Sequence, residues 1–192
     1  MKNFILLILF QCAWFLCVLT PSMATDYAGV FAMLLYLAIV LRFIEAKLSA
    51  FFLIALAGSI GGSVDGILTY AGWYAFPNKE PWTPIYLYAI WFGFAATLAT
   101  SLSWLKSRYA LASLLGAIFG PLNYLAGERL GAVSFPNGVD KTMIMLAFLW
   151  SLELPLLLWI INSSFLTSLK QKPLSNKLLI SSYLKKIFAK QN

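Results

Sequence analysis

Two carboxyl groups stand inside long apolar segments, where an ionised side chain is costly. Asp65 lies in "FFLIALAGSIGGSVDGILTYAGWY", and Glu153 lies in "WSLELPLLLW". A charge at the centre of a membrane costs about 2.5–3.5 kcal/mol on insertion scales, so each carboxyl needs a partner, water or a proton. Such a group could bind a substrate, carry a proton or act as a general acid or base. It could equally be half of a pair that holds two helices together.

The polar partner expected for Asp65 is Arg129, in the segment "GAIFGPLNYLAGERLGA". Its long side chain could reach back toward the depth of Asp65. We expect an Asp65–Arg129 ion pair flanked by Asn123 and Glu128. With Glu153, these residues make up the predicted intramembrane polar cluster. No cation is evident at the depth of Glu153, so its carboxyl is expected to be protonated or to bond to backbone freed by the proline two residues later.

Glycines at helical spacing accompany both parts of this cluster. They form two sets, Gly58, Gly62 and Gly66 around Asp65, and Gly116, Gly120 and Gly127 around Asn123. Small residues at this spacing let two helices approach closely. We therefore expect helix packing as the role of these glycines, with the two sets facing each other and covering Asp65.

The sequence gives little support for metal binding, disulfide formation, phosphate binding or nucleophilic catalysis. The chain has no histidine, which removes the commonest metal ligand and general base. Cys12 and Cys17 are five residues apart in one apolar segment and would point to different sides of a helix, so they cannot pair. No phosphate-binding glycine loop and no nucleophile elbow occurs. The sequence predicts neither a metal nor a cofactor, and an enzyme is the less favoured class.

The composition is that of a membrane protein. Of the 192 residues, 61% are hydrophobic and 11% are charged, whereas a soluble domain averages about 25% charged residues. Six segments are apolar and long enough to cross a bilayer: 3–20, 26–42, 50–73, 84–104, 109–127 and 141–161. The predicted fold is an all-α transmembrane bundle of about six helices within residues 1–161.

Cations alternate between the connections. They occur at Lys2, at Arg42 and Lys47, at Lys106 and Arg108, and in a tail over residues 162–192. The positive-inside rule therefore predicts that both termini are cytoplasmic. The net charge of +7 resides largely in the tail, which has six lysines and no acidic residue. Anionic lipid headgroups are a better partner for such a tail than nucleic acid, whether it forms an amphipathic helix or serves topology alone.

The first segment has a second interpretation. Its basic start, its apolar core and the Ser22-Met23-Ala24 sequence also fit a secretory signal with a cleavage site. Cleavage would leave five spans. The apolar run is long for a signal core, which favours a retained first helix.

A short sequence pattern occurs twice. The pattern G-x-x-x-F-P-N stands at residues 72–78 and again 59 residues later, at 131–137. The same offset relates two further pairs, Gly61 with Gly120 and Trp91 with Trp150. These matches indicate two related helical hairpins, as in transporters built from repeats. Aromatic-proline-asparagine turns also recur at membrane interfaces by chance.

Four stretches, in this order, resemble a known family: "NFILLILFQCAWFLCVL", "GSVDGILTYAGWYAFP", "PWTPIYLYAIWFGFAATLATSLSWL" and "GAIFGPLNYLAGERLGAVSF". From about Asn3 to Trp159, the chain is similar to bacterial inner-membrane proteins of the domain of unknown function 2878. The resemblance implies multi-pass insertion in the inner membrane and a retained first helix. It places five sites at motif positions: Asp65, Trp104, Gly120-Pro121, Tyr124 and Arg129-Leu130-Gly131.

The resemblance implies no established activity. The family pattern often has a histidine where this chain has Thr100, so a histidine-dependent mechanism cannot be carried over. Members often accompany lipid-modifying genes. The resemblance therefore favours membrane lipid as the partner and envelope lipid metabolism as the setting.

Three classes of function remain open. The favoured one is a non-catalytic membrane component that supports envelope or lipid metabolism, in which the polar groups pair and leave no pocket. A small transporter or flippase-like protein would instead have an outward-facing polar cavity. An intramembrane lipid-modifying enzyme would bring two or more titratable groups to one open pocket.

Overall fold

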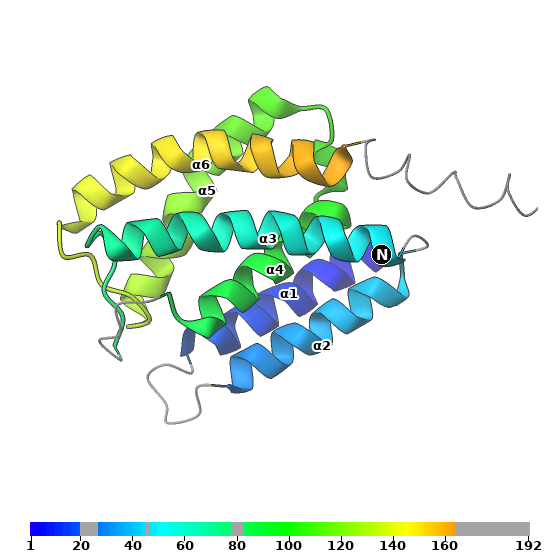
Figure 1. The fold of residues 1–192 in the computed structure, drawn as a ribbon, viewed down its shortest axis with the longest axis horizontal. Coiled ribbons are helices and arrows are strands. Elements are labelled where there is room, and N and C mark those ends of the chain that lie inside the picture. Colours follow the sequence, from blue (N-terminus) through cyan, green and yellow to red (C-terminus); the bar gives the residue numbers. More distant parts are fainter. Residues whose placement is uncertain (20–26, 45–46, 78–82, 164–192) are drawn as a thin grey trace, which may run out of the picture. The chain divides into compact units, whose positions relative to one another are not determined.

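The computed structural model describes residues 1–19, 27–44, 47–77 and 83–163, and this part of the chain forms six α-helices (Figure 1). The helices are α1 (Lys2–Leu19), α2 (Ala28–Arg42), α3 (Lys47–Tyr70), α4 (Ile85–Ala99), α5 (Tyr109–Arg129) and α6 (Val139–Asn162). A 3-10 turn, η2 (Ser103–Leu105), separates α4 from α5. The predicted all-α fold is confirmed.

Four helices in the described part of the chain, α1, α3, α5 and α6, are long and apolar enough to cross a membrane. The helices α2 and α4 are shorter, at 15 residues each. The expected continuous span over 84–104 is wrong, because α4 ends at Ala99. Thr100 and Ser103 donate their hydroxyls to the backbone oxygens of Ala96 and Thr100, at 2.8 and 2.6 Å. The backbone of Thr100, with φ −126° and ψ −85°, has left the helical conformation.

The helices pack as three consecutive pairs, α1 with α2, α3 with α4, and α5 with α6. Both α1 and α2 also pack on α4, and α6 contacts α3 and α4 (Figure 1). Ser101 Oγ donates to the backbone oxygen of Asn3 at 2.7 Å, which places the end of α4 beside the start of α1. Tyr86 Oη donates to the backbone oxygen of Ala132 at 2.8 Å, at the other end of α4. The C-terminal ends of α1 and α5 therefore lie at the same end of the bundle.

The glycines of α3 pack against α4. A Cβ atom on Gly58 would overlap the Phe92 ring, and one on Gly62 would overlap the Tyr88 ring. Gly66 is less tightly packed, since its Cβ would lie 3.4 Å from the nearest atom, Thr83 Oγ1. Gly58 and Gly62 thus lie in close contact with the side chains of α4.

Two glycines of α5 pack closely against α6. Gly116 faces the backbone of Trp150, and Gly120 faces its indole ring. A Cβ on Gly127 would make only an ordinary contact, 3.6 Å from Val133 Cγ1. The expectation that the two glycine sets face each other is wrong. Each set instead lies mainly against the helix that follows it in the chain, with Gly58 and Gly62 against α4, and Gly116 and Gly120 against α6.

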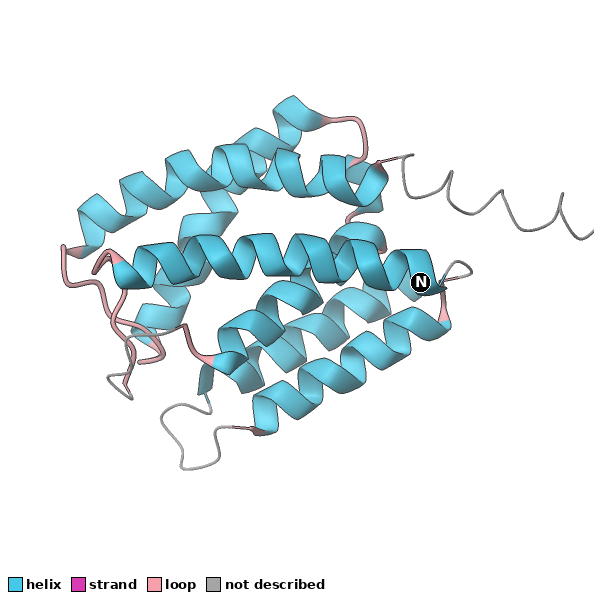
Figure 2. Cartoon of the chain, viewed as in Figure 1, coloured by secondary structure: helices cyan, strands magenta, loops and turns pink. Residues whose placement is uncertain are grey.

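The two G-x-x-x-F-P-N connections have matching backbone structures. Gly72 and Gly131 follow α3 and α5 with φ angles of 76° and 78°, a conformation that glycine adopts without strain. Two hydrogen bonds then join the connections: Ala75 N donates to Ser134 O at 3.0 Å, and Ser134 N donates to Ala75 O at 2.8 Å. Ala75 and Ser134 are themselves 59 residues apart. Figure 2 shows these connections, in pink, at the same end of the helices.

Two earlier predictions fall outside the described residues. The basic tail lies almost wholly within 164–192, and the Ser22–Ala24 cleavage site lies within 20–26. The first helix is part of the packed bundle, where Leu6, Phe10 and Cys17 are buried.

Candidate functional site

Asp65 is buried where three helices converge, with only 1% of its surface exposed. Trp91 of α4 donates its indole N–H to Asp65 Oδ2 at 2.6 Å. Tyr124 of α5 donates its hydroxyl to the same carboxyl, 2.7 Å from Oδ1 and 2.6 Å from Oδ2. Hydrogen bonds from neutral donors can satisfy a buried carboxyl without a cation.

A second tyrosine extends this arrangement from the connection after α3. Tyr74 stacks on Tyr124 with ring centroids 5.4 Å apart. Its buried hydroxyl lies close to Asp65 and Tyr124 but makes no hydrogen bond of good geometry. Burial, followed by the nearby carboxyl of Asp65, raises the pKa of Tyr74 above its ordinary value, so the side chain stays a neutral phenol.

The expected Asp65–Arg129 ion pair is not formed. The side chain of Arg129 is 77% exposed, and its Nε lies 3.5 Å from Glu128 Oε2. Tyr124 takes the place expected for Arg129 beside Asp65. Arg129 follows Tyr124 by five residues, which turns it about 140° around the helix axis. Asn123 is also directed elsewhere, because its Nδ2 donates to the backbone oxygen of Phe119 at 2.9 Å.

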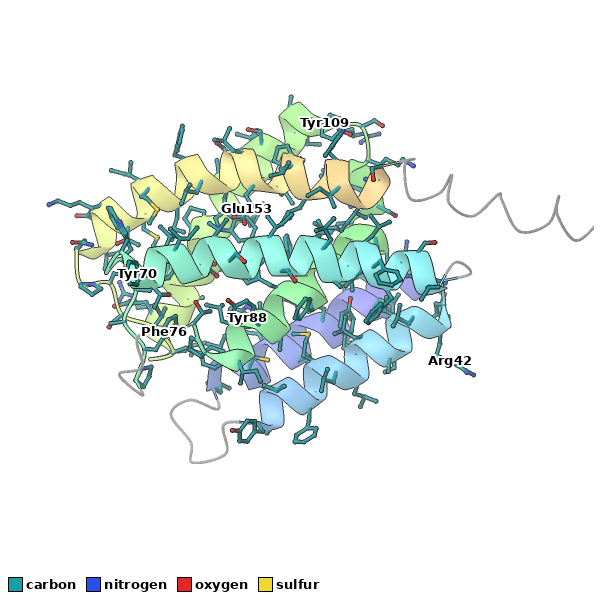
Figure 3. All side chains as sticks on the ribbon, in the orientation of Figure 1. Arg42, Tyr70, Phe76, Tyr88, Tyr109 and Glu153 are labelled. Carbon is teal, nitrogen blue, oxygen red and sulfur yellow. The ribbon has the colours of Figure 1, made fainter. Side chains whose placement is uncertain are left out.

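Glu153 is the second buried carboxyl, 7% exposed on α6. Figure 3 shows it between the ribbons of α6 and α3, two helices that contact each other. Its Oε1 is buried and has no hydrogen-bond partner among the described residues. Glu153 is close enough to Asp65 for the two carboxyls to interact electrostatically. The structure thus brings together Asp65 and Glu153 from the predicted cluster, whereas Glu128 and Arg129 pair with each other and Asn123 stands apart.

Sequence reasoning missed the neutral partners of Asp65, although a signal for them was present. Asp65 and Tyr124 are 59 residues apart, as are Trp91 and Trp150. The two tryptophan rings stack with centroids 5.1 Å apart and planes 16° apart. Both pairs therefore join equivalent positions of the two hairpins, as the Ala75–Ser134 bridge does. Applying the offset to Asp65 would have identified Tyr124.

An apolar groove of about 560 Å³ lies beside these residues. It is lined by α1, α4, α5 and α6, from Trp104 and Leu105 at one end to Tyr74 and Val133 at the other. Along α1 it extends from Leu7 to Val18, a distance of about 17 Å.

Polar atoms in the groove are few. Trp91 and Tyr124 line it while donating to the buried Asp65. Two amide side chains, Gln11 and Asn123, also line it, and no charged side chain does so among the described residues. The described residues likewise contain no group of three His, Cys, Asp or Glu side chains that could hold a metal ion.

Residues 3–156 match the family described as "Protein of unknown function (DUF2878)". The match covers most of the chain and includes nearly all of α1, together with Asp65 and its hydrogen-bond donors Trp91 and Tyr124. Neither a curated protein nor a solved structure matches the chain.

Proposed function

The chain belongs to the DUF2878 family of proteins of unknown function, and we propose that it binds a membrane lipid in the groove between α1, α4, α5 and α6. In this proposal it is a multi-pass protein of the bacterial inner membrane with both termini in the cytoplasm. It supports envelope lipid metabolism without catalysing a reaction. The carrying observation is the apolar groove of about 560 Å³, which follows the helices of spanning length.

The groove has the dimensions and chemistry of a ligand site. Sites for small molecules have volumes of about 300–1,000 Å³ and are mainly apolar, with a few polar groups. Phe119 is 56% exposed and also lines the groove, so the groove is accessible from the surface of the bundle. In a bilayer that surface faces lipid, which makes a lipid chain the natural occupant.

The polar groups favour a binding protein over a transporter. A transporter would expose its carboxyls to a polar cavity, whereas Asp65 is enclosed and accepts hydrogen bonds from Trp91 and Tyr124. The groove itself is apolar. The protein thus combines the paired Asp65 carboxyl expected of a support protein with two features not expected of one. These are the pocket and the buried Glu153 oxygen, which has no hydrogen-bond partner among the described residues.

Two adjacent leucines of α5 provide a matched test. Leu115 lines the groove, whereas Leu114 is 57% exposed and does not line it. Leu115→Trp should fill part of the groove and remove most of the lipid that copurifies with the protein in nanodiscs formed directly from membranes. Leu114→Trp should leave this lipid in place. Quantitative mass spectrometry of the extracted lipid measures both, and equal lipid retention by the two variants would refute the proposal.

An intramembrane acid–base enzyme is the second candidate, and the position of Tyr124 favours it. Its phenol lines the groove and donates to the buried Asp65 carboxyl, so it could exchange a proton with a ligand. Tyr124→Phe removes only the hydroxyl. In a deletion strain, this variant should restore the wild-type lipid profile if the protein only binds lipid. A deletion-like profile at normal protein abundance would support the enzyme instead.

A further inference from the structure

Two amide side chains line the groove from different helices. Gln11 belongs to α1 and Asn123 to α5. Gln11 lies eight residues before the end of α1, about 12 Å along its axis, and Asn123 lies six residues before the end of α5, about 9 Å. Because these two ends lie at the same end of the bundle, the amides occupy similar depths inside the span.

These amides retain hydrogen-bonding capacity. Asn123 uses one N–H on the backbone oxygen of Phe119, which leaves its carbonyl oxygen and its second N–H. Gln11 is exposed on the groove-lining side of α1. An amide in hydrocarbon loses the hydrogen bonds that water would supply, so both side chains are costly beside a purely apolar ligand.

The other side chains restrict the charge of the ligand. No charged residue lines the described part of the groove, so an anionic or cationic group would find no countercharge there. The donors of Trp91 and Tyr124 are already directed to Asp65, and the hydroxyls of Tyr86 and Thr97 donate to backbone oxygens. The Tyr74 hydroxyl is buried, and Trp104 lies at the end of the groove. An amide both donates and accepts, which fits a neutral hydroxyl or carbonyl oxygen.

We infer that the groove selects a lipid whose hydrocarbon portion carries a neutral hydroxyl or carbonyl group, bound between Gln11 and Asn123. This inference rests on the proposed lipid-binding function and names its ligand class. The depth of the amides separates this ligand from an ordinary phospholipid. A headgroup stays at the bilayer surface, whereas the amides lie roughly 10 Å inside the helical span.

A pair of probes that differ in one oxygen tests the inference. The probes are the methyl ester of octadecanoate and the same ester with a ketone in mid-chain, each radiolabelled. Binding is measured to the purified full chain in nanodiscs of saturated phosphatidylcholine. The wild type should bind the ketone ester about tenfold more tightly, the order of magnitude expected from two net hydrogen bonds.

Leucine substitutions test whether the two amides cause the preference for the ketone ester. Gln11→Leu and Asn123→Leu should each reduce the preference about threefold, and the double variant should bind both esters equally. Asn162→Leu is the matched control, because Asn162 donates to the backbone oxygen of Leu158 at 2.7 Å as Asn123 does to Phe119, but does not line the groove. It should keep the full preference.

The possible results distinguish a failure of the inferred ligand class from a failure of the proposed lipid binding. If the wild type binds both esters equally, or if the double variant keeps the preference, the inference is wrong and lipid binding still stands. If neither ester binds, or if binding is unaffected by Leu115→Trp, the proposed function itself fails. Leucine suits a membrane-facing helix surface, and elution as a single species checks that each variant is folded.

Discussion

The hairpins α3–α4 and α5–α6 have matching frameworks but different residues at their centre. At an offset of 59 residues, Gly61 receives the Trp91 ring and Gly120 receives the Trp150 ring. At the same offset, however, Asp65 corresponds to Tyr124. The glycine–tryptophan contact is thus the same in the two hairpins, whereas Asp65 and Tyr124, which meet between them, are an acceptor and a donor.

A second difference lies on the outer faces of α4 and α6. Ala89, Gly93 and Thr97 of α4 are buried, and Gly93 lies directly against Met33 of α2. The corresponding positions of α6 are large, apolar and exposed: Phe148, Leu152 and Leu156. Small residues mark the face on which the α1–α2 pair docks, and large ones mark a face suited to lipid. The α3–α4 hairpin therefore packs against the α1–α2 pair, and α1 of that pair lines the groove.

The largest effect on stability is expected at the hydrogen bond between Asp65 and Tyr124, which joins the two hairpins. Asp65→Leu should lower the free energy of unfolding by about 2–4 kcal/mol, because the Trp91 N–H and the Tyr124 hydroxyl lose their buried acceptor. Tyr124→Phe should cost about 0.6–1.7 kcal/mol, from the average to the largest value found for hydrogen bonds between membrane helices. Steric-trapping measurements in bicelles give these energies.

The double variant identifies the shared bond. Asp65→Leu combined with Tyr124→Phe should cost no more than Asp65→Leu alone, because both changes remove the same interaction. The exposed Asp140 provides the control, since Asp140→Leu should cost less than about 1 kcal/mol. Additive losses from Asp65→Leu and Tyr124→Phe would show that the two hairpins are not joined at these residues.

The paired glycines test whether the two frameworks are equivalent. Gly61→Ala and Gly120→Ala should each cost about 1–3 kcal/mol, because the new methyl group overlaps a buried tryptophan ring. Gly66→Ala and Gly127→Ala are the controls, with nearest contacts of 3.4 and 3.6 Å. They should be neutral or stabilising, since alanine favours a helix by about 1 kcal/mol over glycine. A large loss from only one of Gly61→Ala and Gly120→Ala would contradict the equivalence.

The helices could be predicted from sequence more completely than their contacts. Continuous apolar runs predict helices because a membrane requires every backbone group to be bonded within its own segment. The end of α4 was missed because the apolar run continues past Thr100, where the backbone leaves the helical conformation. Apolarity reports burial or lipid exposure and does not locate such a break.

The partners of Asp65 could not be predicted from charge. A buried carboxyl suggests a cation, and Arg129 was the cation expected to reach its depth, yet an indole and a phenol satisfy the carboxyl instead. The 59-residue offset contained this information, because it relates Asp65 to Tyr124. The groove had no comparable signal, since it arises from the placement of α1 beside α4 and α5 and not from any one segment.

The smallest expected effect concerns the position where α4 has Phe94 and α6 has Glu153. The Phe94 ring packs against Trp150 at 5.5 Å between centroids, whereas Glu153 Oε1 is buried without a hydrogen bond among the described residues. An unbonded buried polar atom costs stability. Glu153→Met keeps the length of the side chain and removes its carboxyl, so it should raise the free energy of unfolding by about 1 kcal/mol.

The sign of the change in the free energy of unfolding shows whether the Glu153 carboxyl, at the position equivalent to Phe94, weakens or stabilises the fold. A loss of stability in Glu153→Met would show that the carboxyl makes a stabilising bond, and the comparison with Phe94 would then be wrong. A gain would mean that α6 retains a group that weakens the fold. Residues of that kind persist where function requires them. The lipid profile of a deletion strain carrying the stabilised variant then tests whether Glu153 contributes to lipid metabolism, because reduced protein abundance can no longer explain a defect.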